Sequence, residues 1–132
     1  MINAPIDFDT LWTRVAEQFP LGQQSIHGPS HWRRVEHNGL ELAEETAGAN
    51  ATVVRLFAVF HDSRRENELT DHEHGLRGGE LAQLVRGQLF CLTDARFALL
   101  YYACAWHERG RTSDDPTTGA CWDADRLDLP RV

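Results

Sequence analysis

The residues best suited to chemistry in this chain are the adjacent pair His61 and Asp62. They follow the segment 53–60, which is nearly all apolar and is therefore expected to form a buried helix. Such a helix delivers an imidazole and a carboxylate close to the protein core. An ionised aspartate in that position is costly unless it is paired or bound to a metal ion. A helix that simply ends at a polar dipeptide is the alternative interpretation.

His31 is the second candidate because of the face on which it lies. At about 100° per residue, His31, Val35 and Leu42 fall on one stripe of a helix, within about 40° of each other. His31 is therefore expected to point inward with the apolar residues. A histidine that is satisfied inside the core without binding a ligand is the alternative.

Asp125 is the third candidate. It shares a helical stripe with Cys121 and Leu129, whereas Asp123 lies about 160° away and is expected in solvent. Asp128 lies about 60° from Asp125 and can flank the same site. An acidic solvated face explains Asp123 well and Asp125 poorly.

Together, His31, His61, Asp62 and Asp125 supply two imidazoles and two carboxylates. This set of ligand types suits a divalent ion such as Mn, Fe, Co, Ni, Zn or Mg. The intervals between the candidates are helix-to-helix distances, so only the fold can bring them together.

The order of these residues resembles the H…HD…D signature of the HD superfamily of metal-dependent phosphohydrolases. Residues 31–35 (HWRRV) are similar to the family's HxxRV, and residues 58–62 (AVFHD) are similar to its apolar helix ending in HD. Residues 123–128 (DADRLD) resemble the segment in which the family's ligand is the aspartate before the basic residue, here Asp125. The resemblance spans about residues 26–129. It implies an all-α bundle that hydrolyses a small phosphate ester or a nucleotide by means of metal-activated water.

His74 and His107 bear on how many ions bind. Both are expected to face inward, and the order H…HD…H…H…D resembles the two-metal subset of the superfamily, which includes cyclic-dinucleotide phosphodiesterases and diiron oxygenases. In that case Asp62 would bridge the ions. Alternatively, His74 and His107 contact the substrate around a single ion, and either can protonate the leaving group. The sequence alone is therefore compatible with a site for one ion and with a site for two ions.

Arginines near the pair are candidates for substrate binding, because a guanidinium matches phosphate oxygens. Arg64 and Arg65 follow Asp62 directly, and Arg65 is the first choice. Glu66 is a candidate general base. His27 is expected either at the mouth of the site or without a role. The expected catalytic set is therefore Asp62, Arg65, His74 and His107.

The elements that must position these residues are mostly helices, because apolar residues recur at helical spacing and strand patterns are absent. We expect one all-α domain over residues 1–132, a bundle of five to six helices similar to HD domains. HD relatives usually continue with further helix, so a trimmed or a minimal form of the domain is expected. The predicted helices cover about residues 9–19, 29–47, 51–61, 73–85, 93–106 and 120–129, with loops at 63–71 and 110–119.

Composition narrows the possible functions. The 132 residues include 20 acidic and 13 basic ones, every basic one an arginine, and the net charge is −7. Coating of duplex nucleic acid is therefore disfavoured. No apolar run is long enough for a membrane span, and the three cysteines form no CxxC pair, so a cytoplasmic protein with free thiols is expected. The expected partner is a small phosphorylated substrate or nucleotide, and a homodimer is left open. A diiron oxygenase and a non-catalytic module that senses a ligand or metal are the alternative functions.

Overall fold

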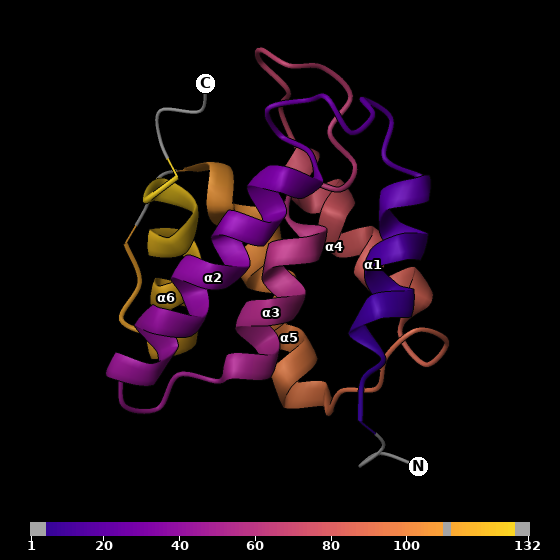
Figure 1. Ribbon diagram of the computed structural model, residues 1–132. Helices are drawn as coiled ribbons and strands as arrows, with labels where there is room; N and C mark the ends of the chain where they lie inside the picture. Colours follow the sequence, from indigo (N-terminus) through magenta and orange to yellow (C-terminus); the bar gives the residue numbers. More distant parts are fainter. Residues whose placement is uncertain (1–4, 110–111, 129–132) are drawn as a thin grey trace.

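The computed structural model describes residues 5–109 and 112–128, and this part of the chain is helical without a strand. The all-α prediction is confirmed. Figure 1 shows the arrangement of the helices. Their bounds are α1 (Phe8–Glu17), α2 (Pro29–Glu45), α3 (Ala51–Phe60), α4 (His74–Val85), α5 (Asp94–Trp106), the 3-10 helix η1 (His107–Arg109) and α6 (Pro116–Arg126).

Helix α3 forms the centre of the bundle. It begins after Asn50, whose side chain accepts a hydrogen bond from the backbone N–H of Val53, and residues 56–60 are all buried. It packs against α1, α2, α4, α5 and α6. A helix that is apolar on every side must be covered on every side, and its last residues therefore lie inside the protein.

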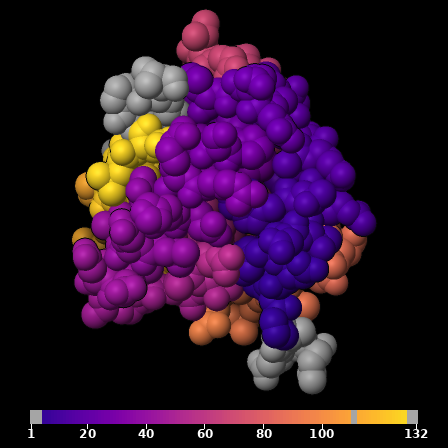
Figure 2. Space-filling view, in the orientation of Figure 1, coloured from indigo at the N-terminus to yellow at the C-terminus, as the bar shows by residue number. Residues whose placement is uncertain are grey.

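Five helix ends meet at one end of the bundle, which is the upper end in Figure 1. These are the starts of α2 and α4 and the ends of α3, α5 and α6, and the segments 18–28 and 61–73 lie at the same end. In the space-filling view of Figure 2, α1, α2 and the segment between them cover the front face. Side chains at the converging ends can therefore meet beneath this surface.

Two glycines let α4 approach its neighbours closely. A methyl group at Gly75 would collide with the carbonyl oxygen of Cys104 in α5, and one at Gly78 would collide with that of Phe60 in α3. The glycine pair 78–79 weakens the helical pattern in the sequence, yet α4 runs through it without interruption. The helix propensity lost at these positions is offset by backbone-to-backbone packing.

The predicted start of the last helix at residue 120 is wrong. Helix α6 begins at Pro116, and the side chain of Asp115 accepts a hydrogen bond from the backbone N–H of Thr118. Proline is a good first helical residue because its missing N–H would have no partner there, so Pro116 starts the helix instead of marking a loop. The predicted end at residue 129 lies outside the described residues. No helix in the described part of the chain is long and apolar enough to cross a bilayer.

Candidate metal centre

The converging helix ends place six histidine and aspartate side chains around one point. His61 and Asp62 directly follow Phe60, the last residue of α3, so the buried central helix delivers both. The others come from the first turns of α2 and α4, from the residue after α5, and from the last turn of α6. In that order they are His31, His74, His107 and Asp125.

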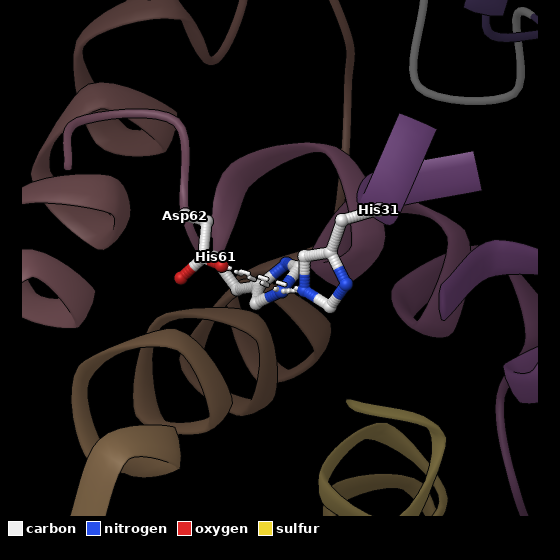
Figure 3. A group of neighbouring side chains, drawn as sticks. All are labelled: His31, His61 and Asp62. Carbon is white, nitrogen blue, oxygen red and sulfur yellow. Dashed lines mark hydrogen bonds and ion pairs between the residues drawn. The ribbon is translucent and has the colours of Figure 1, made fainter. Parts of the chain in front are cut away.

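His31, His61 and Asp62 form the first group (Figure 3). The Nε2 atoms of the two histidines are 3.0 Å apart. Asp62 Oδ2 lies 3.4 Å from His31 Nε2 and 3.6 Å from His61 Nε2. Asp125 adds a second carboxylate, because its Oδ1 atom lies 3.1 Å from His31 Nε2 and 3.5 Å from His61 Nε2. Two imidazoles and two carboxylates therefore meet here.

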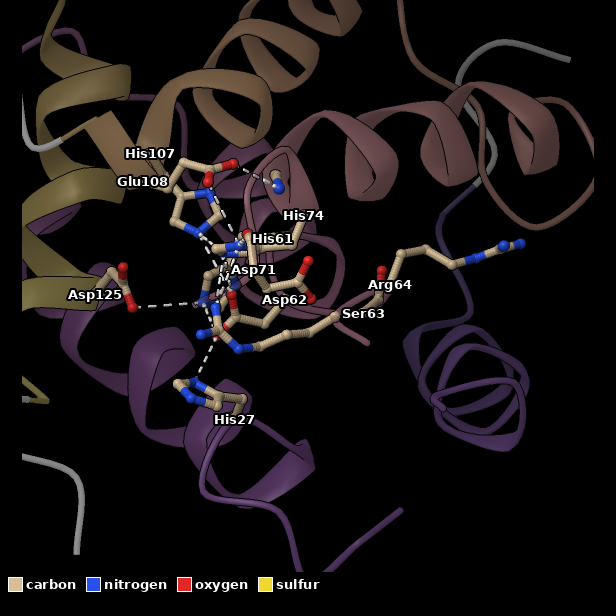
Figure 4. A network of polar contacts seen from close by, with 12 residues as sticks. His27, His61, Asp62, Ser63, Arg64, Asp71, His74, His107, Glu108 and Asp125 are labelled. Carbon is tan, nitrogen blue, oxygen red and sulfur yellow. Dashed lines mark hydrogen bonds and ion pairs between the residues drawn. The ribbon is translucent and has the colours of Figure 1, made fainter. Parts of the chain in front are cut away.

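Asp62, His74 and His107 form a second group on the other side of the same carboxylate (Figure 4). The Nε2 atoms of His74 and His107 are 3.1 Å apart. Asp62 Oδ1 lies 3.1 Å from His74 Nε2 and 3.4 Å from His107 Nε2. The two oxygens of Asp62 thus face two different pairs of histidines.

All four histidines are held in the same tautomer. In each ring, Nδ1 faces an oxygen that can only accept, so Nδ1 carries the hydrogen and Nε2 presents a lone pair to the cluster. The acceptors are Asp128 Oδ2 for His31 at 2.7 Å, the carbonyl of Ala58 for His61 at 3.0 Å, that of Asp71 for His74 at 2.6 Å and that of Cys104 for His107 at 2.8 Å.

This geometry fits divalent metal ions. Two lone pairs that face each other across 3.0 or 3.1 Å repel one another, and a cation between them turns the repulsion into binding. Histidine ligands in metal sites ordinarily donate their other ring hydrogen to a carboxylate or backbone carbonyl, as all four do here. The mixture of imidazole nitrogen and carboxylate oxygen suits borderline divalent ions. The residues present can therefore hold a metal ion in either group.

The charges of the carboxylates also favour the binding of a metal ion. Burial raises the pKa of the Asp62 carboxyl, but its contacts with His61 and the other histidines outweigh burial and hold that pKa well below its usual range. The pKa of Asp125 is also well below its usual range, because His31 and His61 outweigh the effect of burial. Burial lowers the pKa of His61, so its ring favours the neutral form that binds metals. Burial also acts to lower the pKa of His107, but the contact with the Asp62 carboxylate outweighs it and raises that pKa. Asp125, with 15% of its side chain exposed, is the most accessible of the proposed ligands.

Arg65 lies next to the second group. It is buried, and its Nη1 atom is 3.2 Å from both ring nitrogens of His74, which places it over the face of the imidazole and not in line with either nitrogen. Its Nε and Nη2 atoms donate to the carbonyls of Asn67 and Leu69. The structure therefore brings this guanidinium to the cluster, fixed by the backbone of its own loop.

Two other candidates lie outside the cluster. The side chain of Arg64 extends away from it, as Figure 4 shows. Glu66 is 65% exposed and lies 3.7 Å from the guanidinium of Arg77, so it does not reach the cluster. Both residues belong to the loop after Asp62, where the sequence carries no helical periodicity from which side-chain directions can be predicted.

The structure places two further residues beside the cluster, His27 and Glu108. His27 is buried, with Nδ1 3.7 Å from Asp62 Oδ2 and Nε2 donating to the carbonyl of Glu68 at 3.0 Å. It therefore lies against the cluster and is buried, whereas the sequence left open either a place at the mouth of the site or no role. Glu108 is a further addition, and it contacts the start of α4.

Comparisons with models of protein families, with curated proteins and with solved structures find no match to this chain. The resemblance to HD phosphohydrolases therefore depends on the motif residues, and the site itself is a buried His/Asp cluster with the geometry of a metal centre.

Proposed function

We propose that this protein is a metal-dependent phosphohydrolase that acts on a small phosphate ester or a nucleotide. The observation that carries the proposal is the convergence of four imidazole Nε2 atoms on the two oxygens of one buried carboxylate, Asp62. Pairs of metal ions that share such a ligand are typical of enzymes that hydrolyse phosphate esters. The proposal also depends on the motif resemblance described above.

Two ions account for all of the convergent ligands. His31, His61, Asp125 and Oδ2 of Asp62 would hold one ion, and His74, His107 and Oδ1 of Asp62 would hold the other. The second set has three protein ligands, and catalytic sites typically keep positions open for water or substrate. Asp62 would accordingly bind both ions.

The divalent ions supply Lewis acidity, which makes water nucleophilic near neutral pH and polarises a phosphoryl oxygen. The chain's own residues balance the charge of the ions, orient the ligands and bind the substrate. Asp62 and Asp125 remain ionised and balance the charge of the ions. Asp128 and the backbone carbonyls hold the histidine rings in one tautomer. The guanidinium of Arg65 binds phosphate oxygens and offsets the charge that develops on them.

The test uses protein stripped of metal and reloaded separately with Mn, Fe, Co, Ni, Zn or Mg. Hydrolysis is measured on a panel of phosphate esters, as release of phosphate from monoesters and nucleotides and as release of the alcohol and monoester products from diesters. We expect turnover with at least one ion and loss of both bound metal and turnover in Asp62→Ala. Asp123→Ala is the matched control, because Asp123 is 62% exposed on the outer face of α6. An inactive metal-loaded protein, or an Asp62→Ala variant that keeps its metal and its turnover, would show the proposal to be wrong.

A diiron oxygenase is the second candidate, because His74 and His107 both join the cluster, as that function requires. Such an enzyme needs iron and consumes O2, whereas a hydrolase also works with redox-inactive ions such as Mg or Zn. Substrate-dependent O2 uptake by the iron-loaded protein, without hydrolysis of any phosphate ester under any ion, would favour the oxygenase. Ligand-dependent thermal stabilisation without any turnover would favour a sensing module instead.

A further inference from the structure

The start of α4 is held in a way that its own sequence does not provide. Glu73, the residue before the helix, has φ 66° and ψ 12°, a left-handed conformation that is unfavourable for a residue with a side chain. Its side chain makes no capping hydrogen bond to the helix. The first residue of this helix is His74, a member of the second ligand group, so the conformation of this turn fixes where that imidazole lies.

Glu108 supplies the missing cap from another element. Its Oε1 atom accepts a hydrogen bond from the N–H of Glu73 at 3.2 Å, and its Oε2 atom accepts one from the N–H of Gly75 at 3.1 Å. A carboxylate at a helix N-terminus is favoured by the helix dipole. Glu108 directly follows His107, and Figure 4 shows it beside that ring.

We propose that Glu108 is a positioning residue for the second ion. Its carboxylate binds the backbone on both sides of His74, and its own backbone directly follows His107, so it holds the two histidines in place relative to each other. This inference rests on the proposed function, in which these two histidines and Asp62 hold that ion. Without Glu108, the N–H groups of Glu73 and Gly75 lose their acceptor and the left-handed turn at Glu73 loses its support. The carbonyl of Asp71 accepts a hydrogen bond from the ring of His74 at 2.6 Å and a longer one from its backbone N–H at 3.4 Å, but the N–H groups of Glu73 and Gly75 on either side donate to Glu108. Among the described residues, Glu108 pairs with Glu73, Gly75 and, at 3.6 Å, with Nδ1 of His74. None of these contacts reaches His31 or His61, so the first ion is expected to be unaffected.

The test is a stepwise titration of metal-free protein with Co2+. Binding is measured by calorimetry and by the visible absorption of the bound ions. Wild type is expected to bind two ions. Glu108→Ala should bind the second ion about 10- to 100-fold more weakly, as is usual when the support of a metal ligand is lost, and the first ion with unchanged affinity. The affinity of Glu108→Gln for the second ion should lie between those of wild type and Glu108→Ala, because the amide oxygen still accepts one N–H while the NH2 group accepts none. Glu80→Gln, at an exposed position of the same helix, is the matched control and should behave as wild type.

A second variant separates positioning from general stability. Adding Glu73→Gly to Glu108→Ala removes the backbone strain at the turn, and part of the affinity for the second ion should return. If both ions bind Glu108→Ala and Glu108→Gln as tightly as wild type, the inference about Glu108 is wrong while the proposed function stands. If wild type itself binds fewer than two ions, the two-ion centre of the proposed function fails, and the inference fails with it.

Discussion

Asp62 is the residue whose replacement should remove metal binding most completely, because each of its oxygens faces a different pair of histidines. Asp62→Asn keeps the shape of the side chain but removes the charge, and one of the two oxygens becomes an NH2 group that cannot bind a metal ion. Both proposed ions therefore lose an anionic ligand through a single substitution. The two oxygens of Asp62 lie 3.1 to 3.6 Å from the four Nε2 atoms. Among the described residues, no other carboxylate lies against all four histidines.

The size of the effect follows from ligand linkage. An ion present at 100 times its dissociation constant stabilises the folded state by about 2.7 kcal/mol, so two ions contribute about 5 kcal/mol. For a chain of this length, about 3–5 °C in Tm accompanies each kcal/mol, which gives a metal-dependent rise of about 15–25 °C in wild type. Asp62→Asn should keep less than about a third of that rise, since neither ion retains its full set of ligands.

The assay is thermal unfolding of each protein with saturating metal and with chelator, so that each variant serves as its own reference. Asp123→Asn is the matched control, because it makes the same chemical change on an exposed side chain of α6. Asp123→Asn should show the full metal-dependent rise. An Asp62→Asn variant with the wild-type rise would refute the assignment of Asp62 as a ligand shared by both groups.

Three further predictions concern packing, substrate binding and pH. Gly78→Ala should lower the free energy of unfolding by about 1–3 kcal/mol in urea denaturation, because the new methyl group would collide with the carbonyl oxygen of Phe60. Gly119→Ala, whose methyl group has room, should leave the free energy of unfolding unchanged. Equal stability of both variants would contradict the close approach of α4 to α3. Arg65→Lys should raise KM for the phosphate ester about 10- to 100-fold with bound metal unchanged, since a charged hydrogen bond contributes about 1.5–3 kcal/mol, and an unchanged KM would exclude Arg65 from substrate binding. Bound metal should be lost as the pH falls through about 6.5 and below, because imidazoles must be neutral to bind while both carboxylates stay ionised; full metal content after dialysis at strongly acidic pH would rule out histidine ligands.

Helical periodicity predicted the side-chain directions that matter most in this fold. His31 and Asp125 share stripes with apolar residues, and both point into the bundle because a helix repeats its faces every 3.6 residues. The position of His61 and Asp62 at the end of an apolar helix predicted their burial in the same way. The all-α fold followed from the same periodicity.

Other features depend on contacts between elements, which periodicity does not encode. The cap that Glu108 provides to α4 and the hydrogen bond from His31 to Asp128 join residues 33 and 97 positions apart. The burial of His27 depends on how two loops meet, through the carbonyl of Glu68. The start of α6 differs from the prediction for a local reason, because a proline both breaks helices and begins them, and here Asp115 caps the N–H of Thr118 three residues later.

The most direct test of the metal centre is a crystal structure of metal-loaded protein, with anomalous diffraction recorded on both sides of the absorption edge of the bound ion. We expect two anomalous peaks, one beside Oδ2 of Asp62 among His31, His61 and Asp125, and one beside Oδ1 between His74 and His107. A metal-saturated crystal without any anomalous peak beside Asp62 would contradict the account.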